Sequence, residues 1–264
     1  MGSAGETRPA IFAWFGIPVP FPERMRLLRD AGFGITSIWW EERNPEGRRL
    51  RHLAPGIARG FGLDIEHIHV PYQGCNDLWS DNGHRRTDAL DRHLRWIEDC
   101  ARHEVPTMVM HVVSGRGNHL DHARGVDSMA RLLEAAERCG ITIAIENTRR
   151  NDLVDLLLER LAVPHLGLCF DNAHDALHHD TPLALLRRWR DRLVTTHISD
   201  CDGKRDQHWI PGEGTLDFGE LHGVLRPYEG ACLLEVVPRD RNEAPEPFLR
   251  RAYAAAVRQV EGAT

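Results

Sequence analysis

Residues 141–171 read ITIAIENTRRNDLVDLLLERLAVPHLGLCFD, and this stretch decides the fold. It begins and ends with short apolar runs, ITIAIEN at 141–147 and LGLCFD at 166–171, which are typical of buried parallel strands. Between them, DLVDLLLERL at 152–161 places its leucines at the spacing of an amphipathic helix. The stretch therefore predicts a strand, a helix and a second strand parallel to the first.

The same alternation extends over most of the chain. A last helix is predicted at 245–260, after the final strand. Eight strand–helix units in 264 residues predict an α/β fold, a single-domain (β/α)8 TIM barrel spanning residues 1–264. An open doubly wound sheet is disfavoured, because no G-x-G-x-x-G follows the first strand. The other predicted strands are AIFAWFG (10–16), ITSIWW (35–40), IEHIHV (65–70), TMVMHV (107–112), LVTTHIS (193–199) and ACLLEV (231–236).

The composition excludes several classes of protein. With 42% hydrophobic residues and a formal net charge of −6, the chain is not largely disordered. The same charge argues against a nucleic-acid binder but leaves room for a local basic groove. No apolar run approaches the ~18–20 residues of a membrane span. The single lysine, Lys204, argues against Schiff-base and P-loop chemistry. The six cysteines form no C-x-x-C pair, and MGSAGETRPA at residues 1–10 lacks the apolar stretch of a signal peptide, so we expect reduced cysteines and a cytoplasmic location.

Polar residues gather at the carboxyl ends of the predicted strands, where barrels carry their chemistry. Burying several carboxylates in one barrel mouth is costly unless a cation compensates. Carboxylates mixed with imidazoles suit divalent transition ions. We therefore predict a metal site for Mn²⁺ or Zn²⁺, with Mg²⁺ and Co²⁺ as alternatives. The strands from the third to the eighth supply, at or just after their ends, His69, His111, Glu146, Asp171, His174, His197 and Glu235.

The loop after the seventh strand, DCDGKRDQHWIPGEGTLDF at 200–218, adds further candidates. Asp206 and His208 are two residues apart, so on an extended segment both side chains face the same way. The PGEG turn that follows is expected to fold the loop back over the barrel mouth. Arg205 is either solvated or binds an anionic substrate.

Aromatic residues at the first two strands either pack in the core or form an apolar wall for a sugar ring or a base. We predict the second role for Trp14 and Trp40, and by alternation only one of the adjacent Trp39 and Trp40 faces the interior. The histidines on predicted helices and loops are expected at the surface: His52, His84, His93, His103, His119, His122, His165, His178, His179 and His222.

At these motifs the sequence resembles the xylose-isomerase-like TIM barrel superfamily, which includes sugar-phosphate isomerases and epimerases and also endonuclease IV. The combination is specific, whereas any one segment alone is weak. The segments that carry the resemblance are HVPY (69–72), AIEN (144–147), DNAH (171–174), HISDCDGKRDQHWIPGEGTLDF (197–218) and LLEVVP (233–238).

The resemblance implies a metal-dependent sugar or sugar-phosphate isomerase or epimerase. In that branch the metal polarises the substrate carbonyl. One glutamate then removes a neighbouring proton to give an enediolate, and the other returns it, which assigns Glu146 and Glu235 as catalytic. His174 resembles a ligand of a substrate hydroxyl. A small carbohydrate substrate and a homodimer or homotetramer are also implied. The metal ligands carried over are Glu146, Asp171, His197 and Glu235.

The alternative is an endonuclease-IV-like phosphodiester hydrolase that uses three zinc ions at abasic DNA. Many sugar-acting relatives keep most of the same histidines, so the set discriminates weakly between the two branches. The acidic chain argues against a nucleic-acid partner, because such an enzyme needs basic residues at its rim. We therefore prefer the isomerase branch. The additional metal or substrate ligands that match the endonuclease branch are His69, His111, His174, Asp206 and His208.

Overall fold

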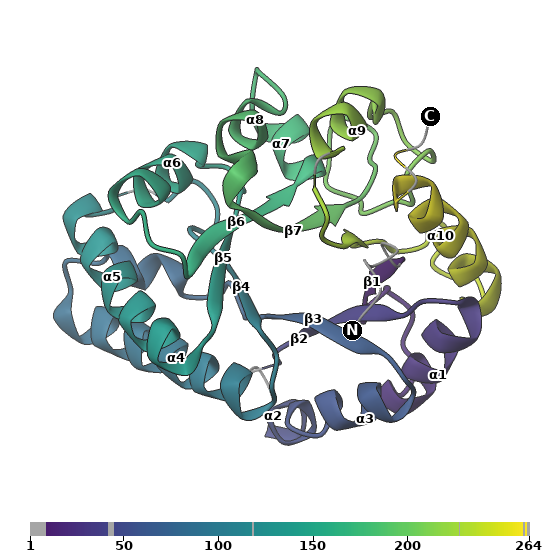
Figure 1. The fold of residues 1–264 in the computed structure, drawn as a ribbon, viewed down its shortest axis with the longest axis horizontal. Helices are drawn as coiled ribbons and strands as arrows, with labels where there is room; N and C mark the ends of the chain where they lie inside the picture. Colours follow the sequence, from purple (N-terminus) through teal and green to yellow (C-terminus); the bar gives the residue numbers. More distant parts are fainter. Residues whose placement is uncertain (1–8, 42–44, 118, 227, 261, 263–264) are drawn as a thin grey trace.

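An eight-stranded parallel barrel forms the centre of the molecule. The computed structural model describes residues 9–41, 45–117, 119–226, 228–260 and 262. Each strand pairs in parallel with the next, and the first pairs with the last, so the sheet closes (Figure 1). The predicted (β/α)8 TIM barrel is confirmed. The strands are β1 (Ala10–Phe12), β2 (Ile35–Trp39), β3 (Asp64–His69), β4 (Thr107–His111), β5 (Thr142–Glu146), β6 (Leu166–Asp171), β7 (Leu193–Ile198) and β8 (Cys232–Leu234).

Helices connect the strands and surround the barrel (Figure 1). The two longest begin at side-chain caps: Asn82 accepts the backbone N–H of Arg85, and Asp121 accepts that of Arg124. The helices are α1 (Phe21–Ala31), α2 (Pro45–Arg51), α3 (Ala54–Gly60), η1 (Cys75–Trp79), α4 (Gly83–Arg102), α5 (His122–Cys139), α6 (Asn151–Arg160), α7 (Asn172–His178), α8 (Ala184–Trp189), η2 (Arg190–Arg192), α9 (Gly219–Leu225) and α10 (Pro245–Val260), where η marks a 3₁₀ helix.

The last helix packs against the first, which closes the helical layer (Figure 1). Gly32 ends α1 with a φ of +106°, and a Cβ at this position would lie 2.7 Å from the Tyr253 ring of α10. The same ring makes an edge contact with Phe33, with 5.3 Å between ring centroids. Glycine therefore serves here both the left-handed turn and the close approach of the two helices.

Side chains that point into the barrel form two layers. The polar residues of the predicted site form the layer at the mouth, and apolar residues form a layer beneath them, which we call the floor. The Phe12 ring lies across this interior, 6.0 Å from the His69 ring and 6.2 Å from the His197 ring. Each residue of the floor stands two positions before a residue of the predicted site, so the strand period points both into the barrel. The floor on the β4–β6 side is the buried cluster Val109, Ala144 and Cys169.

One histidine predicted at the surface is buried instead. His93 of α4 is 1% exposed, and its ring packs on Trp96. Its Nδ1–H donates to the Ala89 carbonyl over 2.7 Å, and burial lowers its pKa to about 4. The prediction for His93 is wrong because positions 89, 93 and 96 share the helix face that packs on the barrel.

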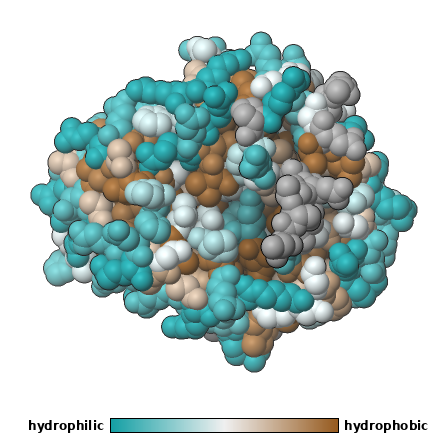
Figure 2. All heavy atoms as spheres, viewed as in Figure 1, coloured by the Kyte–Doolittle hydropathy of each residue, from teal (hydrophilic) through white to brown (hydrophobic). Residues whose placement is uncertain are grey.

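The face shown in Figure 2 carries mostly hydrophilic residues, with hydrophobic ones among them. None of the helices in the described ranges is both long and apolar enough to cross a membrane. All six cysteines are free. Residues 1–8, on which the prediction of no signal peptide partly rests, lie outside the described residues. The cytoplasmic location and the homo-oligomer stay predictions.

Candidate metal centre

Four predicted residues meet inside the barrel mouth. Their ligand atoms all lie within 4.8 Å of one another. Parallel pairing explains part of this convergence, because Asp171 at the end of β6 stands directly beside His197 of β7. Nδ1 of His197 lies 3.2 Å from Glu146 Oε1 and 3.0 Å from Glu235 Oε2. We call this set the central cluster: Glu146, Asp171, His197 and Glu235.

The central cluster has the properties of a cation site. Asp171 Oδ2 and His197 Nδ1 are buried and have no hydrogen-bond partner. Burial raises the pKa of Asp171 to about 6, helped by the nearby charge of Glu146. Three carboxylates in one buried space repel one another and lose hydration, and a divalent cation would offset both costs. The donor set of three carboxylates and one imidazole fits a divalent ion of the kind predicted.

A second group shares the Glu146 carboxylate. Oε2 of Glu146 lies 2.9 Å from His69 Nε2 and 3.1 Å from His111 Nε2. The Nδ1–H of His69 donates to the Val70 carbonyl over 3.0 Å, so in a neutral imidazole Nε2 presents a lone pair to the carboxylate. The lone pairs of His69 Nε2 and Glu146 Oε2 repel each other at this distance unless a proton or a cation lies between them. His69, His111 and Glu146 therefore form a second candidate metal site.

A third group lies at the outer edge of the mouth. Oδ2 of Asp206 is 3.2 Å from Nε2 of His174 and also 3.2 Å from Nε2 of His208. Backbone carbonyls fix both rings at their other nitrogen: Nδ1 of His174 donates to Asn147, and Nδ1 of His208 donates to Glu235. Although burial opposes it, the hydrogen bond with Asp206 raises the pKa of His208 to about 10. Without a cation, this group is held together by protonated imidazoles.

One aspartate holds the loop that carries this third group. The Asp200 carboxylate accepts the backbone N–H groups of Gly212, Gly214 and Leu216 at 2.8–3.1 Å. The backbone of Asp200 also forms an antiparallel bridge with Trp209, which follows His208. The loop therefore folds back through the PGEG turn as expected, and His208 is held at a left-handed φ of +54°.

An aromatic wall stands beside the second group, and it corrects one prediction. Trp40 is completely buried, and its indole N–H donates to Asp99 Oδ2 of α4 over 2.9 Å, so it faces away from the mouth. Trp39 faces the mouth instead: its ring lies 5.4 Å from His69 and 5.9 Å from Tyr72. The register of β2 against β3 shifts between positions 36 and 38, so the side that each tryptophan faces did not follow from alternation alone.

The two other predicted substrate contacts lie at the rim. Trp14 follows β1 and is 45% exposed, and the Arg24 guanidinium stacks on its ring at 4.7 Å. Arg205 lines a pocket, although its side chain is 78% exposed and lies 3.7 Å from Asp202. Their binding roles stay predictions.

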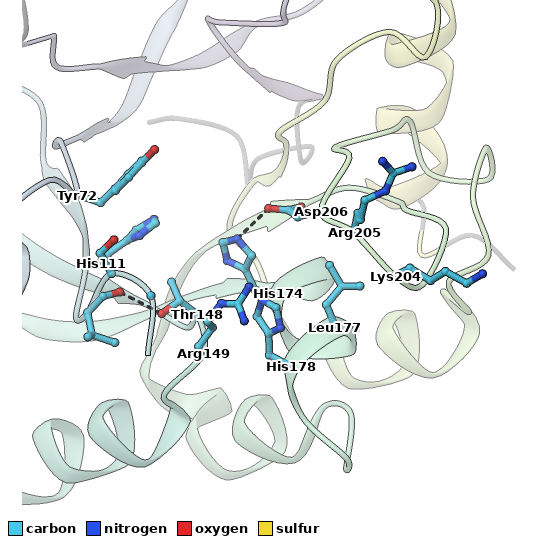
Figure 3. A pocket seen from close by; sticks show the side chains of 13 residues that line it. Tyr72, His111, Thr148, Arg149, His174, Leu177, His178, Lys204, Arg205 and Asp206 are labelled. Atoms are coloured by element: carbon cyan, nitrogen blue, oxygen red, sulfur yellow. Dashed lines mark hydrogen bonds and ion pairs between the residues drawn. The ribbon is translucent and has the colours of Figure 1, made fainter. Parts of the chain in front are cut away.

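The pocket opens between the second and third groups and has a volume of about 360 Å³. His111 and His174 lie at its inner side, and Tyr72 stacks on His111 with 5.1 Å between ring centroids. Figure 3 shows the Arg149 guanidinium beside His178, close to His174. The lining residues are Tyr72, His111, Val113, Ser114, Gly115, Thr148, Arg149, His174, Leu177, His178, Lys204, Arg205 and Asp206.

Sequence reasoning missed several residues around the site. Trp39, Tyr72 and Arg149 face the mouth or the pocket, and His67 lies directly behind His197. His67 had a readable signal, because in IEHIHV it stands two residues before His69 and so shares its face of β3. Burial, together with the neighbouring imidazoles of His197 and His69, holds the pKa of His67 well below its ordinary value.

Comparison with known proteins places the chain among barrels of the same fold. The family described as "Xylose isomerase-like TIM barrel" matches residues 25–254. The chain belongs to this family. Fructoselysine 3-epimerase of Escherichia coli O157:H7 is 29% identical over 89% of this chain and 91% of that protein. A probable endonuclease 4 of Cenarchaeum symbiosum (strain A) is 22% identical over 73% of this chain and 80% of that protein.

A solved structure of L-ribulose 3-epimerase superposes with a TM-score of 0.78 at 15% identity, covering 97% of this chain and 95% of that chain. At this identity the superposition shows a shared fold. The predicted membership of the xylose-isomerase-like family is confirmed, and the family's epimerases and its endonucleases are both among the relatives of this chain.

Proposed function

We propose that this protein is a divalent-metal-dependent epimerase or isomerase of a ketose sugar. The observation that carries the proposal is the approach of two glutamates to one imidazole: Glu146 and Glu235 both lie within 3.2 Å of Nδ1 of His197. Moving a proton on and off carbon needs one group that removes it and one that returns it. Two carboxylates on one candidate metal cluster supply that pair.

The central cluster would hold the ion. When bound, a divalent ion polarises the sugar carbonyl and so acidifies the neighbouring C–H. Nδ1 of His174, at the inner side of the pocket, is held by the Asn147 carbonyl, so a substrate hydroxyl would meet its Nε2 in place of Asp206. His69, His111 and His208 would orient substrate or hold a weaker second ion.

Both glutamates are held in the form that accepts a proton. Burial alone would raise their pKa values, but the charge of His111 and of His197 holds the pKa of Glu146 well below its ordinary value. Without a bound cation, the charge of His197 lowers the pKa of Glu235 to about 2. In the proposed reaction one glutamate removes the proton from the carbon beside the carbonyl. The other returns it to the opposite face, or to the adjacent carbon in an isomerisation.

The side chains of Glu146 and Glu235 differ in exposure and in the number of groups that hold them. Glu146 is 1% exposed and its Oε2 is shared by His69 and His111, whereas the Glu235 side chain is 24% exposed and its close side-chain contact is with His197. A carboxylate with fewer fixed partners reorients more easily between accepting a proton and donating it. The contacts therefore favour Glu235 as the group that moves during turnover.

The pocket favours a substrate that carries a negative charge away from the reacting carbons. Arg149 and Lys204 line it, and among the described residues neither forms an ion pair. Asp206, the only carboxylate among the lining residues, is already shared by two imidazoles. Arg149 lies near enough to His178 to lower its pKa, after burial itself, which supports a positive local potential. A carboxylate or phosphate on the sugar would be stabilised there.

The experiment that tests the proposal is product analysis on a panel of ketoses. The metal-loaded protein is incubated with neutral ketoses, ketose phosphates and ketose acids, and the mixtures are separated by chromatography. We expect at least one ketose to give its epimer or its aldose isomer, and the chelated protein to give none. No conversion of any member by the metal-loaded protein would contradict the proposal.

Phosphodiester hydrolysis at abasic DNA is the second candidate. The specific observation in its favour is that three His/carboxylate groups adjoin one another, which is a set that could hold several zinc ions. The formal charge of −6 opposes it, because binding to DNA depends on neutralising phosphates with basic residues. Incision assays on an abasic duplex separate the two candidates.

A further inference from the structure

His67 lies against the side of His197 that faces away from the central cluster. The Nε2 atoms of the two rings are 3.3 Å apart, and both side chains are completely buried. At its other nitrogen, Nδ1 of His67 lies 3.2 Å from Oε2 of Glu66. The Thr195 hydroxyl donates to the same oxygen over 2.9 Å. Glu66, His67 and His197 thus form a continuous chain that ends at the cluster.

Cation binding at the inner end would determine the hydrogen positions along this chain. At the inner end, His197 Nδ1 faces Glu146 and Glu235, so to bind a cation it must present a lone pair there and carry its proton on Nε2. That N–H points at His67 Nε2, which must then accept it. His67 consequently carries its proton on Nδ1 and donates it to the Glu66 carboxylate.

We propose that His67, held by Glu66, is a positioning residue that fixes the tautomer and ring orientation of His197 for metal binding. The inference rests on the proposed metal-dependent function of the central cluster. A ligating histidine usually donates its second N–H to an oxygen acceptor, and losing that partner commonly costs tenfold to hundredfold in metal affinity. Here a second histidine takes the place of the oxygen acceptor.

The alternative role for His67 is simple packing inside the barrel. Its ring contacts Phe12 as well as His197, with ring centroids 6.4 and 5.2 Å away. A packing role depends on volume and apolar surface, whereas the positioning role depends on an acceptor at Nε2. Variants of similar volume with and without an acceptor therefore distinguish the two roles.

The experiment measures Mn²⁺ binding by calorimetry on the full chain after removal of bound metal. His67→Leu keeps most of the volume and removes the acceptor, and His67→Gln restores an acceptor oxygen. His93→Leu is the matched control, because His93 is also a buried histidine but contacts Ala89 and Trp96 instead of the cluster. Thermal unfolding of the metal-free proteins checks that each variant is folded.

We expect His67→Leu to weaken Mn²⁺ binding tenfold to hundredfold, His67→Gln to recover most of it and His93→Leu to leave it unchanged. Unchanged binding in folded His67→Leu would overturn the positioning role and leave the proposed function standing. A wild-type protein that binds no divalent ion would overturn both.

A second measurement needs no variant. Nitrogen-15 NMR of the zinc-loaded wild-type protein reports which ring nitrogen of each histidine carries the proton. We expect the proton of His67 on Nδ1 and that of His197 on Nε2. A proton on Nε2 of His67 would overturn the inference, because two N–H groups cannot donate to each other.

Discussion

Asp171 and His174 are joined by a hydrogen bond that leaves half of a carboxylate free. Oδ1 of Asp171 accepts the backbone N–H of His174 over 2.7 Å and so caps helix α7, while Oδ2 is buried without a hydrogen-bond partner. One side chain thus begins the helix that carries His174 and also offers an oxygen to the central cluster. The DNAH motif at 171–174 combines both tasks in four residues.

Because the two oxygens of Asp171 have different roles, its substitutions should change metal affinity and stability separately. Asp171→Asn keeps a capping oxygen and replaces the free oxygen with an amide NH₂, so we expect metal affinity to fall at least tenfold with little change in stability. Asp171→Ala removes both oxygens and should cost an additional ~1 kcal/mol of unfolding free energy from the lost cap. Calorimetric Mn²⁺ titration and urea unfolding of the metal-free proteins measure the two effects. Equal metal affinity in Asp171→Asn and wild type would show that Oδ2 is no ligand.

Arg149 is expected to discriminate between charged and neutral substrates. Arg149→Gln should raise KM for an accepted ketose phosphate or ketose acid about tenfold, with kcat nearly unchanged, because the guanidinium binds a part of the substrate that does not react. Arg190→Gln is the control. It removes one positive charge from η2, where Arg190 lies 3.7 Å from Asp191, and Arg190 is not among the residues that line the pocket. If both variants shift KM alike, the effect is general electrostatics and the anionic subsite is wrong.

The barrel and its polar mouth could be predicted from the sequence because both follow from short-range patterns. Apolar runs near 110, 145 and 168 mark the strands, and parallel strands in a barrel end at one rim. Glu146, Asp171 and His197 therefore had to converge once the fold was assigned. The loop candidates Asp206 and His208 depended on spacing and on a family resemblance, and the structure brings them to His174.

Longer-range features could not be predicted in the same way. The side on which Trp39 and Trp40 lie depends on an irregularity in how β2 pairs with β3, which the sequence does not display. The position of Arg149 depends on the path of the segment after β5. By contrast, His67 and His93 carried periodic signals, the first along a strand and the second along a helix, that a stricter use of alternation would have detected.

The buried His93 predicts a specific loss of stability in acid. The pKa of His93 in the folded protein is about 4, below the ordinary value of 6.5. Between these two pH values His93 is protonated in the unfolded chain but neutral in the folded one. The stability that neutral His93 contributes is complete above pH ~6.5 and is lost as the pH falls toward ~4. At about 1.4 kcal/mol per pH unit, wild type should lose ~2 kcal/mol more than His93→Leu between pH ~6.5 and ~5. Urea unfolding at both pH values measures this, and parallel losses would contradict the assignment.

The number of metal ions separates the two candidate functions. We expect one tightly held divalent ion per chain at the central cluster, because its three carboxylates overcompensate a single ion and leave room for substrate oxygens. We also expect no useful incision of an abasic-site duplex at physiological salt. Elemental analysis of the purified protein and a gel assay of the duplex test both expectations. Three stoichiometric zinc ions, with incision that His69→Ala abolishes, would favour the hydrolase.

The central claim is that Glu146 and Glu235 move a proton on the carbon beside a sugar carbonyl. Its most direct measurement is proton NMR of an accepted ketose in D₂O with the metal-loaded protein. We predict that the signal of that C–H disappears as deuterium enters the sugar, and that Glu146→Gln and Glu235→Gln each slow this exchange at least a hundredfold while circular dichroism shows a folded barrel. Epimer formation without solvent deuterium, or exchange at the wild-type rate in either variant, would contradict the account.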